Sequence, residues 1–358
     1  MFLERLWLTD FRNYVEADIS FDPGLTALVG SNGEGKTNVL EALGYLATLQ
    51  SFRGAPPDAL VRCGTERATV RAEGTRDGRR ILIEAEITPG GRGRVQINRQ
   101  RLPRTRDLLG ALRVTVFAPD DLTLVKGGPA GRRRYLDDLL VAIHPRHDAL
   151  RSDLERILRQ RNALLRQAAG RLSPEVSVTL EVWDAKLTEV GEALGEARAA
   201  LVERLGPRLA DAYERVARRS ATVSARYEAT WRTRGLARAL VGVRREELRR
   251  GVSLVGPHRD ELVLSIDGLP ARTHASQGEQ RSLALALRLA AHAEVTATVG
   301  EAPVLLLDDV FSELDPDRSE ALLTHLPAGQ TVLTTASGLP AGARPDRVLR
   351  VSGGRISP

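Results

Sequence analysis

Apolar and polar residues alternate along much of the first hundred positions. "FLERLWL" (2–8) and "EADISF" (16–21) show this alternation, and "DFRNY" (10–14) separates them as a turn. "LTALVG" (25–30) is instead a short apolar run that ends in glycine. Alternation predicts half-exposed strands, whereas an unbroken apolar run predicts a buried one. Short strands joined by Gly, Asp and Pro turns between 66 and 98 indicate an antiparallel sheet beside the buried strand.

The middle of the chain has helical spacing. From about 146 to 218, apolar residues recur at alternating steps of four and three, as in helices that pack on one another. The repeat consists of Trp183, Leu187, Val190, Leu194, Ala197 and Leu201. "GRLSPE" (170–175) predicts a turn between two antiparallel helices, and Pro207 is expected to interrupt the second. Because the segment is too short for a long coiled-coil rod, we expect a compact helical arm.

Strand patterns return after residue 250. "ELVLSID" (261–267), "APVLLLDD" (302–309) and "QTVLTTAS" (330–337) are the expected strands, and a helix that starts at Ser276 lies between the first two. Strands separated by helices indicate a mainly parallel sheet covered on both faces.

The predicted fold class is therefore α/β, with a mixed sheet, a flanking antiparallel β-subdomain and an inserted helical lobe. We expect residues 1–125 and 251–358 to form one discontinuous lobe, and residues 126–250 to form the helical lobe between its halves. With 358 residues, of which 42% are apolar, the chain is long enough to bury a substantial core in each.

The composition indicates the cellular compartment in which the protein is expected. The single cysteine, Cys63, excludes an internal disulfide framework and is typical of a reducing environment. The N-terminus carries acidic residues and alternates, so it does not resemble a signal peptide. No apolar run approaches the roughly 20 residues that a bilayer span needs. We expect a cytoplasmic protein without a membrane partner.

The net charge is +6, and nearly all the positive charge is arginine, because Lys36, Lys126 and Lys186 are the only lysines. A basic chain favours polyanionic partners. Three arginine clusters are candidate phosphate contacts: "NRQRLPRTR" (98–106), "GRRRYLD" (131–137) and "RREELRR" (244–250). The alternative for each cluster is a solvated face or local ion pairs, and for Arg132 and Arg133 it is packing between the lobes.

Two features that the sequence lacks indicate which kind of nucleic acid is the expected partner. No zinc-ligand spacing occurs, and aromatic residues make up only 4% of the chain, too few for a platform that stacks single-stranded bases. Duplex or junction DNA, contacted through its phosphates, is therefore the favoured partner.

"GSNGEGKT" (30–37) matches G-x-x-x-x-G-K-[ST] between an expected buried strand and a helix. Glycines let the backbone turn and approach phosphate, and the amides at the helix start supply donors. Lys36 is expected to reach the β- and γ-phosphates of ATP, and Thr37 to bind Mg²⁺. The expected nucleotide-binding residues are Gly30, Ser31, Asn32, Gly33, Glu34, Gly35, Lys36, Thr37 and Asn38. An accidental glycine-rich turn is the alternative, which the flanking strand and helix disfavour.

"VLLLDDVFSELD" (304–315) ends an apolar strand in two carboxylates, at the end where doubly wound sheets bind ligands. Asp308 is expected to hold Mg²⁺ directly or through water. Asp309, together with Lys36, is the expected catalytic group, placed to orient or deprotonate the attacking water. The alternative is that both carboxylates cap the next turn.

"SQGEQRSLALALRLA" (276–290) begins with Ser-x-x-Glu, a capping box that explains Ser276 and Glu279 without any ligand. It does not explain Gly278, since glycine is a poor residue in a first helical turn. We expect Ser276, Gln277, Gly278 and Glu279 to contact phosphate, because helix N-termini bind anions. One fold separates this helix from its own phosphate loop, so the phosphates of a second copy are the expected ligand.

The order of phosphate loop, Ser-x-Gly signature, acidic strand and "SELD" (312–315) resembles an ABC-type ATPase head, and the inserted arm resembles the SMC-like branch. "DFRNY", "VFAPDDLTLVKGGPAGRRRYLD" (116–137) and "GPHRDEL" (256–262) are similar to the RecF family of bacterial DNA-repair ATPases. The resemblance runs through essentially the whole chain. It implies that Arg12 and Asn32 also contact the nucleotide.

The resemblance further implies an ATP-dependent homodimer that binds DNA, hydrolyses ATP slowly as a DNA-dependent ATPase, and works with RecR and RecO to direct RecA to gapped or stalled DNA. Two departures concern the switch: Thr335 stands where ABC heads have a γ-phosphate-sensing histidine, and the usual magnesium-linking glutamine is replaced by "VFAPDD". A third is that Asp309 stands in place of a glutamate. Alternatives left open are a transporter ATPase subunit, a metabolite kinase and another SMC-like chromosome ATPase.

Overall fold

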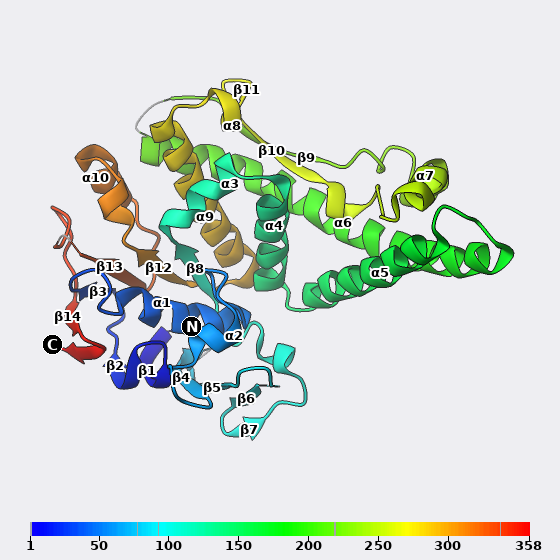
Figure 1. Ribbon diagram of the computed structural model, residues 1–358. Coiled ribbons are helices and arrows are strands. Elements are labelled where there is room, and N and C mark those ends of the chain that lie inside the picture. Colours follow the sequence, from blue (N-terminus) through cyan, green and yellow to red (C-terminus); the bar gives the residue numbers. More distant parts are fainter. Residues whose placement is uncertain (1, 77, 92, 218–219, 337) are drawn as a thin grey trace. The chain divides into compact units, whose positions relative to one another are not determined.

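The computed structural model describes residues 2–76, 78–91, 93–217, 220–336 and 338–358 (Figure 1). The chain divides into two compact units. Unit 1 comprises Met1–Leu122, Arg208–Ala221 and Ser276–Pro358, and unit 2 comprises Thr123–Pro207 and Thr222–Ala275. Positions 218 and 337, at the ends of two expected elements, lie outside the described residues. Within the described ranges, no helix is both long enough and apolar enough to cross a membrane.

Unit 1 contains an antiparallel sheet of six strands in the order β2-β1-β4-β5-β6-β7. The strands are β1 (Phe2–Phe11), β2 (Tyr14–Ser20), β4 (Ala68–Arg76), β5 (Arg79–Ile87), β6 (Arg94–Ile97) and β7 (Gln100–Arg101). Burial alternates along β1 and β4, since successive side chains of a strand point to opposite faces. This confirms the antiparallel sheet that the alternating sequence predicts.

The second sheet of unit 1 has the order β15-β14-β3-β13-β12-β8 and is parallel except for β15. Its strands are β3 (Leu25–Val29), β8 (Val114–Phe117), β12 (Val304–Asp308), β13 (Thr331–Thr335), β14 (Arg347–Ser352) and β15 (Arg355–Ser357). All five residues of β12 and of β13 are buried, as expected for central strands covered on both faces. Because β13 lies between β3 and β12, its carboxyl end separates the phosphate loop from the acidic pair.

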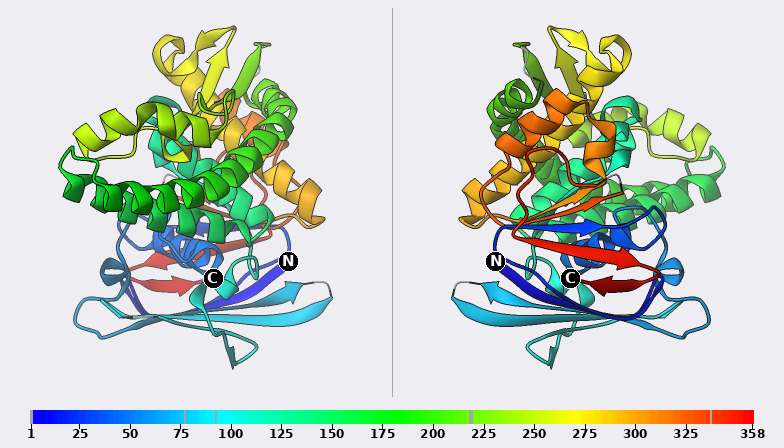
Figure 2. Two further views of the ribbon diagram at one scale, coloured as in Figure 1. Left: turned by 90° about the vertical axis from the view of Figure 1, so that its right-hand side faces the viewer. Right: turned by 90° about the vertical axis from the view of Figure 1, so that its left-hand side faces the viewer.

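Helix α1 (Lys36–Thr48) lies between the two sheets of unit 1 (Figure 2) and contacts β4 and β5 on one side and β8, β12 and β13 on the other. Its residues are buried without a break from Val39 to Ala47. A helix that is buried all round belongs to a core. This core includes both sheets, so the start of α1 has a rigid support.

The other elements of unit 1 are shorter or lie outside its core. They are α2 (Pro57–Leu60), α9 (Gln277–Val299), α10 (Pro316–Thr324), the end of α6 (Pro174–Ala217), and the 3₁₀ turns η1 (Thr105–Leu108), η2 (Pro119–Asp121) and η4 (Val310–Glu313). The predicted interruption at Pro207 is wrong, because α6 continues through it. Leu205 and Leu209 on either side are buried, and their packing outweighs the missing proline N–H.

Unit 2 combines helices with a small antiparallel sheet of order β11-β10-β9. Its elements are α3 (Leu122–Lys126), α4 (Pro129–Ile143), α5 (His147–Ala168), most of α6, α7 (Leu236–Arg250), α8 (Ala271–His274), η3 (Pro257–Arg259), β9 (Val223–Glu228), β10 (Glu261–Ile266) and β11 (Leu269–Pro270). The predicted turn between two antiparallel helices is confirmed by the break between α5 and α6. Of the predicted seam, Leu187, Leu194 and Leu201 are fully buried.

The unit boundaries differ from the expected lobes in two places. The sequence pattern puts "ELVLSID" in the parallel sheet, and this prediction is wrong, because β10 pairs antiparallel with β9 from Glu261–Glu228 to Ile266–Val223. Residues 251–275 consequently belong to unit 2. Residues 208–221 belong to unit 1, although the sequence indicates that they continue the helical arm. Single-strand periodicity cannot reveal which partner a strand chooses.

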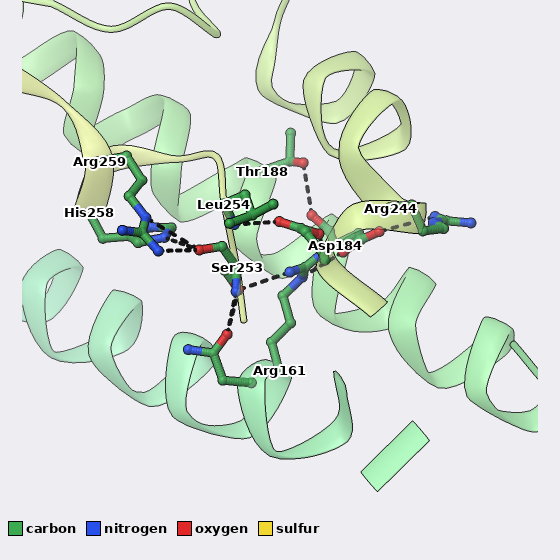
Figure 3. Close-up of polar contacts among 10 residues, drawn as sticks. Arg161, Asp184, Thr188, Arg244, Ser253, Leu254, His258 and Arg259 are labelled. Atoms are coloured by element: carbon green, nitrogen blue, oxygen red, sulfur yellow. Dashed lines mark hydrogen bonds and ion pairs between the residues drawn. The ribbon is translucent and has the colours of Figure 1, made fainter. Parts of the chain in front are cut away.

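A buried ionic network joins three helices of unit 2 (Figure 3). Arg161 of α5 is fully buried, and its guanidinium donates to Asp184 at 2.8 Å, Glu247 at 2.6 Å and the Ser253 hydroxyl at 2.8 Å. Asp184 also accepts from Arg244 at 3.0 Å. Each guanidinium nitrogen of Arg161 therefore has a partner, as a charge in an apolar interior requires.

The segments "GRRRYLD" (131–137) and "GPHRDEL" (256–262) lie together in unit 2. Arg132 is buried and forms two hydrogen bonds, of 2.7 and 2.9 Å, with Glu261. Arg198 forms two of 2.7 Å with Asp137 and a third of 2.7 Å with the carbonyl of Pro257. The segments 131–137 and 256–262 are thus bound to each other by ion pairs and backbone contacts.

Candidate nucleotide site

The phosphate loop connects β3 to α1, and its three glycines have different structural reasons. Gly33 and Gly35 have φ angles of 85° and 113°, in the region that favours glycine, and Gly35 is the N-cap of α1. A Cβ on Gly30 would lie 2.2 Å from the carbonyl oxygen of Val351 on β14. Gly30 is therefore needed for packing between strands, whereas the sequence motif attributes it to approach of phosphate.

A cavity of about 730 Å³ opens beside the loop. Half of the predicted nucleotide-binding residues line it together with the predicted catalytic Asp309: Arg12, Asn32, Gly33, Gly35, Lys36, Thr37 and Asn38. The Lys36 ammonium donates to the carbonyls of Gly30 and Ser31, each at 2.7 Å. Burial lowers the pKa of Lys36, while Asp309, Asp308 and Glu34 oppose that shift. The three carboxylates therefore favour the charged form of Lys36, and a charged lysine beside a phosphate loop suits an anionic ligand.

Gly30, Ser31 and Glu34 do not line the cavity. The Glu34 carboxylate instead accepts the N–H of Gly353, in the turn between β14 and β15. The Glu34 carbonyl accepts from the Asn13 amide at 3.0 Å. The side chain of Glu34 thus holds the loop against the sheet edge, and sequence spacing alone could not distinguish this from contact with a nucleotide.

Asp308 ends β12 and is buried. Its Oδ1 accepts from the Thr37 hydroxyl at 2.7 Å and from the Thr334 hydroxyl at 2.8 Å. Desolvation raises the Asp308 pKa, and the two hydroxyl hydrogen bonds oppose the rise. A cation here would relieve the desolvation of the carboxylate.

The Thr37–Asp308 pair fits Mg²⁺. This ion is commonly bound through one or two protein groups together with phosphates and water, not by a cage of protein ligands. Among the described residues, no group of three or more His, Cys, Asp and Glu side chains forms such a cage. Thr37 and Asp308 would hold the ion from the protein side, where it would neutralise phosphate charge.

Asp309 has a φ of 47°, which is uncommon for a residue other than glycine, although Asp tolerates it better than most. Its N–H donates to the Thr334 hydroxyl at 2.9 Å. Its Oδ1 is buried and has no hydrogen-bond partner among the described residues. The left-handed conformation turns the chain away from β12, and the carboxylate reaches the cavity with a free acceptor.

Thr334 is a site residue that the sequence does not reveal. It lines the cavity and bridges Asp308 and Asp309, because β13 lies between β3 and β12. Thr335, the residue singled out from the sequence, is buried and donates its hydroxyl to the carbonyl of Gly338 at 2.7 Å. The strand places the side chains of neighbouring residues on opposite faces, so the structure favours Thr334.

The turn "DFRNY" braces the phosphate loop. The Tyr14 hydroxyl donates to the Gly35 carbonyl at 3.0 Å, and the Asn13 amide oxygen accepts from Asn38 at 2.8 Å. Arg12 lines the cavity, but its guanidinium donates to Glu41 at 2.7 and 2.8 Å and to the Ala59 carbonyl at 2.8 Å. The turn "DFRNY" thus has a local function: it fixes the start of α1.

Sequence reasoning missed several lining residues besides Thr334. They are Asn13, Arg53, Asp58, Ala59, Val61 and Cys63. Asn13 lies inside a motif and could have been found from it. The segment from Asp58 to Cys63 carries no motif and reaches the site through tertiary pairing, with Arg12 N–H donating to Leu60 and Arg62 N–H to Asp10, both at 2.8 Å.

Helix α9 begins with the predicted capping box. The Ser276 hydroxyl accepts from the N–H of Glu279 at 3.3 Å, and the Glu279 carboxylate accepts from the N–H of Ser276 at 2.8 Å. A Cβ on Gly278 would lie 2.9 Å from the guanidinium of Arg318 on α10. The group that approaches Gly278 closely is therefore the Arg318 side chain of the same chain. Ser276, Gln277, Gly278 and Glu279 do not line the cavity.

A phosphate loop on a parallel sheet, an acidic strand end two strands away and a capped signature helix define an SMC-like ABC-type ATPase head. The RecF/RecN/SMC N-terminal domain model matches residues 2–335. The chain belongs to the RecF family of DNA replication and repair proteins.

Two relatives illustrate the match. RecF of Pseudarthrobacter chlorophenolicus is 44% identical over 94% of both chains, and RecF of Frankia alni is 48% identical over 94% of this chain and 93% of its own. A solved structure of the recombination mediator protein RecF with ATP superposes with a TM-score of 0.91 at 28% identity, covering 99% of this chain and 97% of that one. The Smc head of Pyrococcus furiosus shares the fold alone (TM-score 0.58, 18% identity, 99% and 95% covered).

Proposed function

We propose that this protein is an ATP-gated DNA-binding dimer, in which ATP joins two heads and slow hydrolysis separates them. In this proposal the signature residues Ser276, Gln277, Gly278 and Glu279 of one copy complete the phosphate site of the other. The supporting observation is the division of the predicted residues. Asp309 and most of the phosphate-loop residues line one cavity, whereas none of the four signature-helix residues lines it.

The roles within the site follow from its contacts. Lys36 holds the phosphates, Thr37 and Asp308 hold Mg²⁺, and Asp309 orients the attacking water. The hydrogen bond between Thr37 and Asp308 supports the second role. The buried Asp309 oxygen without a partner supports the third. Aspartate is one methylene shorter than the glutamate usual in such heads, so we expect slow turnover.

The partners are proposed from family membership and charge. The net charge of +6 suits a polyanion, and we propose that gapped or duplex DNA stimulates the weak ATPase activity. The RecF structure with ATP is described as part of the RecFOR pathway. We therefore propose that the protein acts with RecR, and through it with RecO and RecA, at gapped or stalled-replication DNA.

Sedimentation velocity with and without ATP, Mg²⁺ and a gapped duplex tests the proposal. The wild type should sediment as a dimer with ATP and as a monomer without it. Lys36→Ala should remain monomeric, because it loses the cation that binds the phosphates. Ser276→Arg should bind ATP with nearly unchanged affinity and yet stay monomeric, since its arginine would enter the partner's site. Ser276→Thr, which keeps the hydroxyl of the capping box, is the matched control and should dimerise.

A wild-type protein that encloses ATP as a monomer, or a Ser276→Arg variant that dimerises normally, would contradict the composite site. Dimerisation without any DNA binding would remove the proposed partner while leaving the ATP-dependent switch in place.

A further inference from the structure

The three arginine clusters of the sequence differ in how their side chains are used. In the segment 131–137, Arg132 is bound to Glu261, Arg133 donates to the Asp260 carbonyl at 2.8 Å, and Arg134 pairs with Asp138 at 3.6 Å. Burial is also the largest cause that lowers the pKa of Arg133. Arg132 and Arg133 therefore hold unit 2 together, and only Arg134, which is half exposed, faces solvent.

The segment 244–250 is mostly ion-paired as well. Arg244 donates to Asp184 at 3.0 Å, and Arg249 and Arg250 share the carboxylate of Glu246. Arg245 is exposed and is the exception. An exposed pair of this kind contributes little to stability, but it cancels much of the local positive charge.

The third cluster lies at the free edge of the antiparallel sheet of unit 1. We define the arginine edge as the four arginines of this cluster, Arg99, Arg101, Arg104 and Arg106, together with Arg79 at the start of β5 and Arg94 at the start of β6. All six are exposed, and none forms an ion pair with another described residue. Nearby carboxylates are engaged elsewhere, because Glu86 pairs with Arg67 at 3.6 Å and Glu84 with Arg71. The exposed Asp107 accepts a backbone N–H, that of Arg104.

The backbone of the arginine edge is well held. Asn98 and Arg99 have φ angles of 51° and 64° and form the tight turn between β6 and β7, of the type that fits a twisted hairpin. Asn98 exchanges two hydrogen bonds of 2.8 Å with the backbone of Leu82 on β5. Arg76, Arg79 and Arg80 line a hollow beside Asn98. Arg94, Arg99 and Arg101 are therefore placed on a hairpin with a fixed backbone.

The surroundings indicate what kind of polyanion would bind. Between residues 68 and 108, no large apolar side chain of the described chain is exposed, so the edge lacks the apolar anchors of a protein interface. The segment 94–106 contains no Phe, Tyr or Trp on which unstacked bases could stack. A hydrated, regularly charged backbone is the ligand that these side chains suit best.

We propose that the arginine edge is the surface that contacts the phosphate backbone of duplex DNA, without reading base sequence. The proposal rests on the DNA-binding function proposed above and names the side chains that carry it. A competing role exists: charged residues on an edge strand prevent edge-to-edge pairing between sheets. Either sign of charge performs that competing role, whereas only positive charge binds phosphate, so charge reversal separates the two.

The test measures binding of a fluorescent 30-base-pair duplex across a salt series, with ATP and Mg²⁺ present. The edge variant carries Arg94→Gln, Arg101→Gln and Arg106→Gln, which avoid the strained turn. The control variant carries Arg245→Gln, Arg249→Gln and Arg250→Gln, which remove the same charge from α7. Because each lost phosphate contact lowers the log–log salt slope by about 0.9, the edge variant should lose up to roughly 2.7 of slope and bind about tenfold more weakly or worse near 0.1 M salt. The control should match the wild type within about twofold.

The charge-reversed variant, with Glu at the same three edge positions, should lose duplex binding altogether while it stays soluble and binds ATP. Unchanged slope and affinity in both edge variants would overturn the arginine edge, even if the wild type binds DNA. Aggregation of the Gln variant but not of the Glu variant, with duplex binding retained, would assign the arginines to edge protection. Preference for a single strand of equal length would overturn the duplex assignment. A wild type that binds ATP but no DNA at any salt would refute the DNA-binding function itself.

Discussion

Gly278 and Gly30 show that glycines in two predicted phosphate-binding motifs can be required for different reasons. A Cβ on Gly278 would approach the Arg318 guanidinium at 2.9 Å, and one on Gly30 would approach a strand carbonyl at 2.2 Å. The first neighbour is the end of a flexible side chain and can move, whereas the second is backbone and cannot. A substitution at Gly30 is therefore expected to disturb the fold, and one at Gly278 mainly the position of Arg318.

Asp309 is the residue whose proposed role can be isolated most cleanly. Asp309→Asn keeps a side chain that tolerates the left-handed conformation, so the fold and ATP binding should be retained. It removes the carboxylate that would orient water, and general bases typically contribute 10²–10⁴-fold. We expect at least a tenfold fall in the steady-state ATPase rate and a longer-lived ATP dimer.

The matched control for Asp309 is Asp58→Asn, which removes a carboxylate from the same cavity. Its rate should stay within about twofold of the wild type. An unchanged rate in the Asp309 variant would contradict this assignment. An equal loss in both variants would also contradict it, because it would show that the rate depends only on the total negative charge in the cavity.

At the scale of elements, the buried ion pairs of unit 2 determine how α5, α6 and α7 pack. Arg161 is the shared partner, contacting Asp184 on α6 and Glu247 on α7. The same three helices also share a small apolar cluster of Leu165, Ala168, Leu180 and Leu248. The helices therefore rely on a fully satisfied polar network for a unique arrangement, in addition to apolar burial.

Arg161→Met should reduce the free energy of unfolding by about 3–5 kcal/mol, because it leaves the buried Glu247 without its cation and Asp184 with Arg244 alone. Denaturant titration followed by circular dichroism measures the loss. Arg156→Met is the control: its pair with Asp153 is exposed, so the change should stay within about 0.5 kcal/mol. Adding Asp184→Asn and Glu247→Gln to Arg161→Met should recover part of the loss. A single-variant effect below about 1 kcal/mol would show that the network does not support the helices.

At the scale of the whole molecule, two histidines have a pKa far below the ordinary range: the buried His292 in unit 1 and the partly buried His258 in unit 2. Burial lowers the pKa of His292 in unit 1 and of His258 in unit 2 to about 4. The unfolded chain takes up a proton near pH 6.5, and the native state does so only near pH 4. Stability therefore falls as the pH drops through this interval and is fully present above it.

For His292, the acid-side loss should reach about 3 kcal/mol, since one pKa unit corresponds to about 1.4 kcal/mol. His292 is 2% exposed, so solvent does little to screen this effect. Thermal unfolding from pH 7 to pH 4 should show a smaller decline in His292→Gln than in the wild type. His147→Gln, at a partly exposed histidine, should follow the wild type. Parallel curves for His292→Gln and the wild type would contradict the assignment.

Local patterns in the sequence determined the elements and much of the nucleotide cavity. Alternation along β1 and β4, the apolar run of β3 and the capping box of α9 depend on neighbours within a few residues, so spacing alone predicts them. The glycine-rich loop and the acidic strand end likewise have reasons that are local to each segment, which is why the sequence alone predicts Lys36, Thr37 and Asp309, all of which line the cavity.

Only the tertiary structure decided which segments meet. The order of strands places Thr334 where it bridges Asp308 and Asp309. The pairing of β10 with β9 moves residues 251–275 into unit 2, and buried packing carries α6 through Pro207. The tertiary structure also determines which arginines are paired with carboxylates and which are exposed without an ion pair. These outcomes depend on contacts between residues far apart in the chain, and a periodicity, which records only the environment of its own segment, contains no information about the partner.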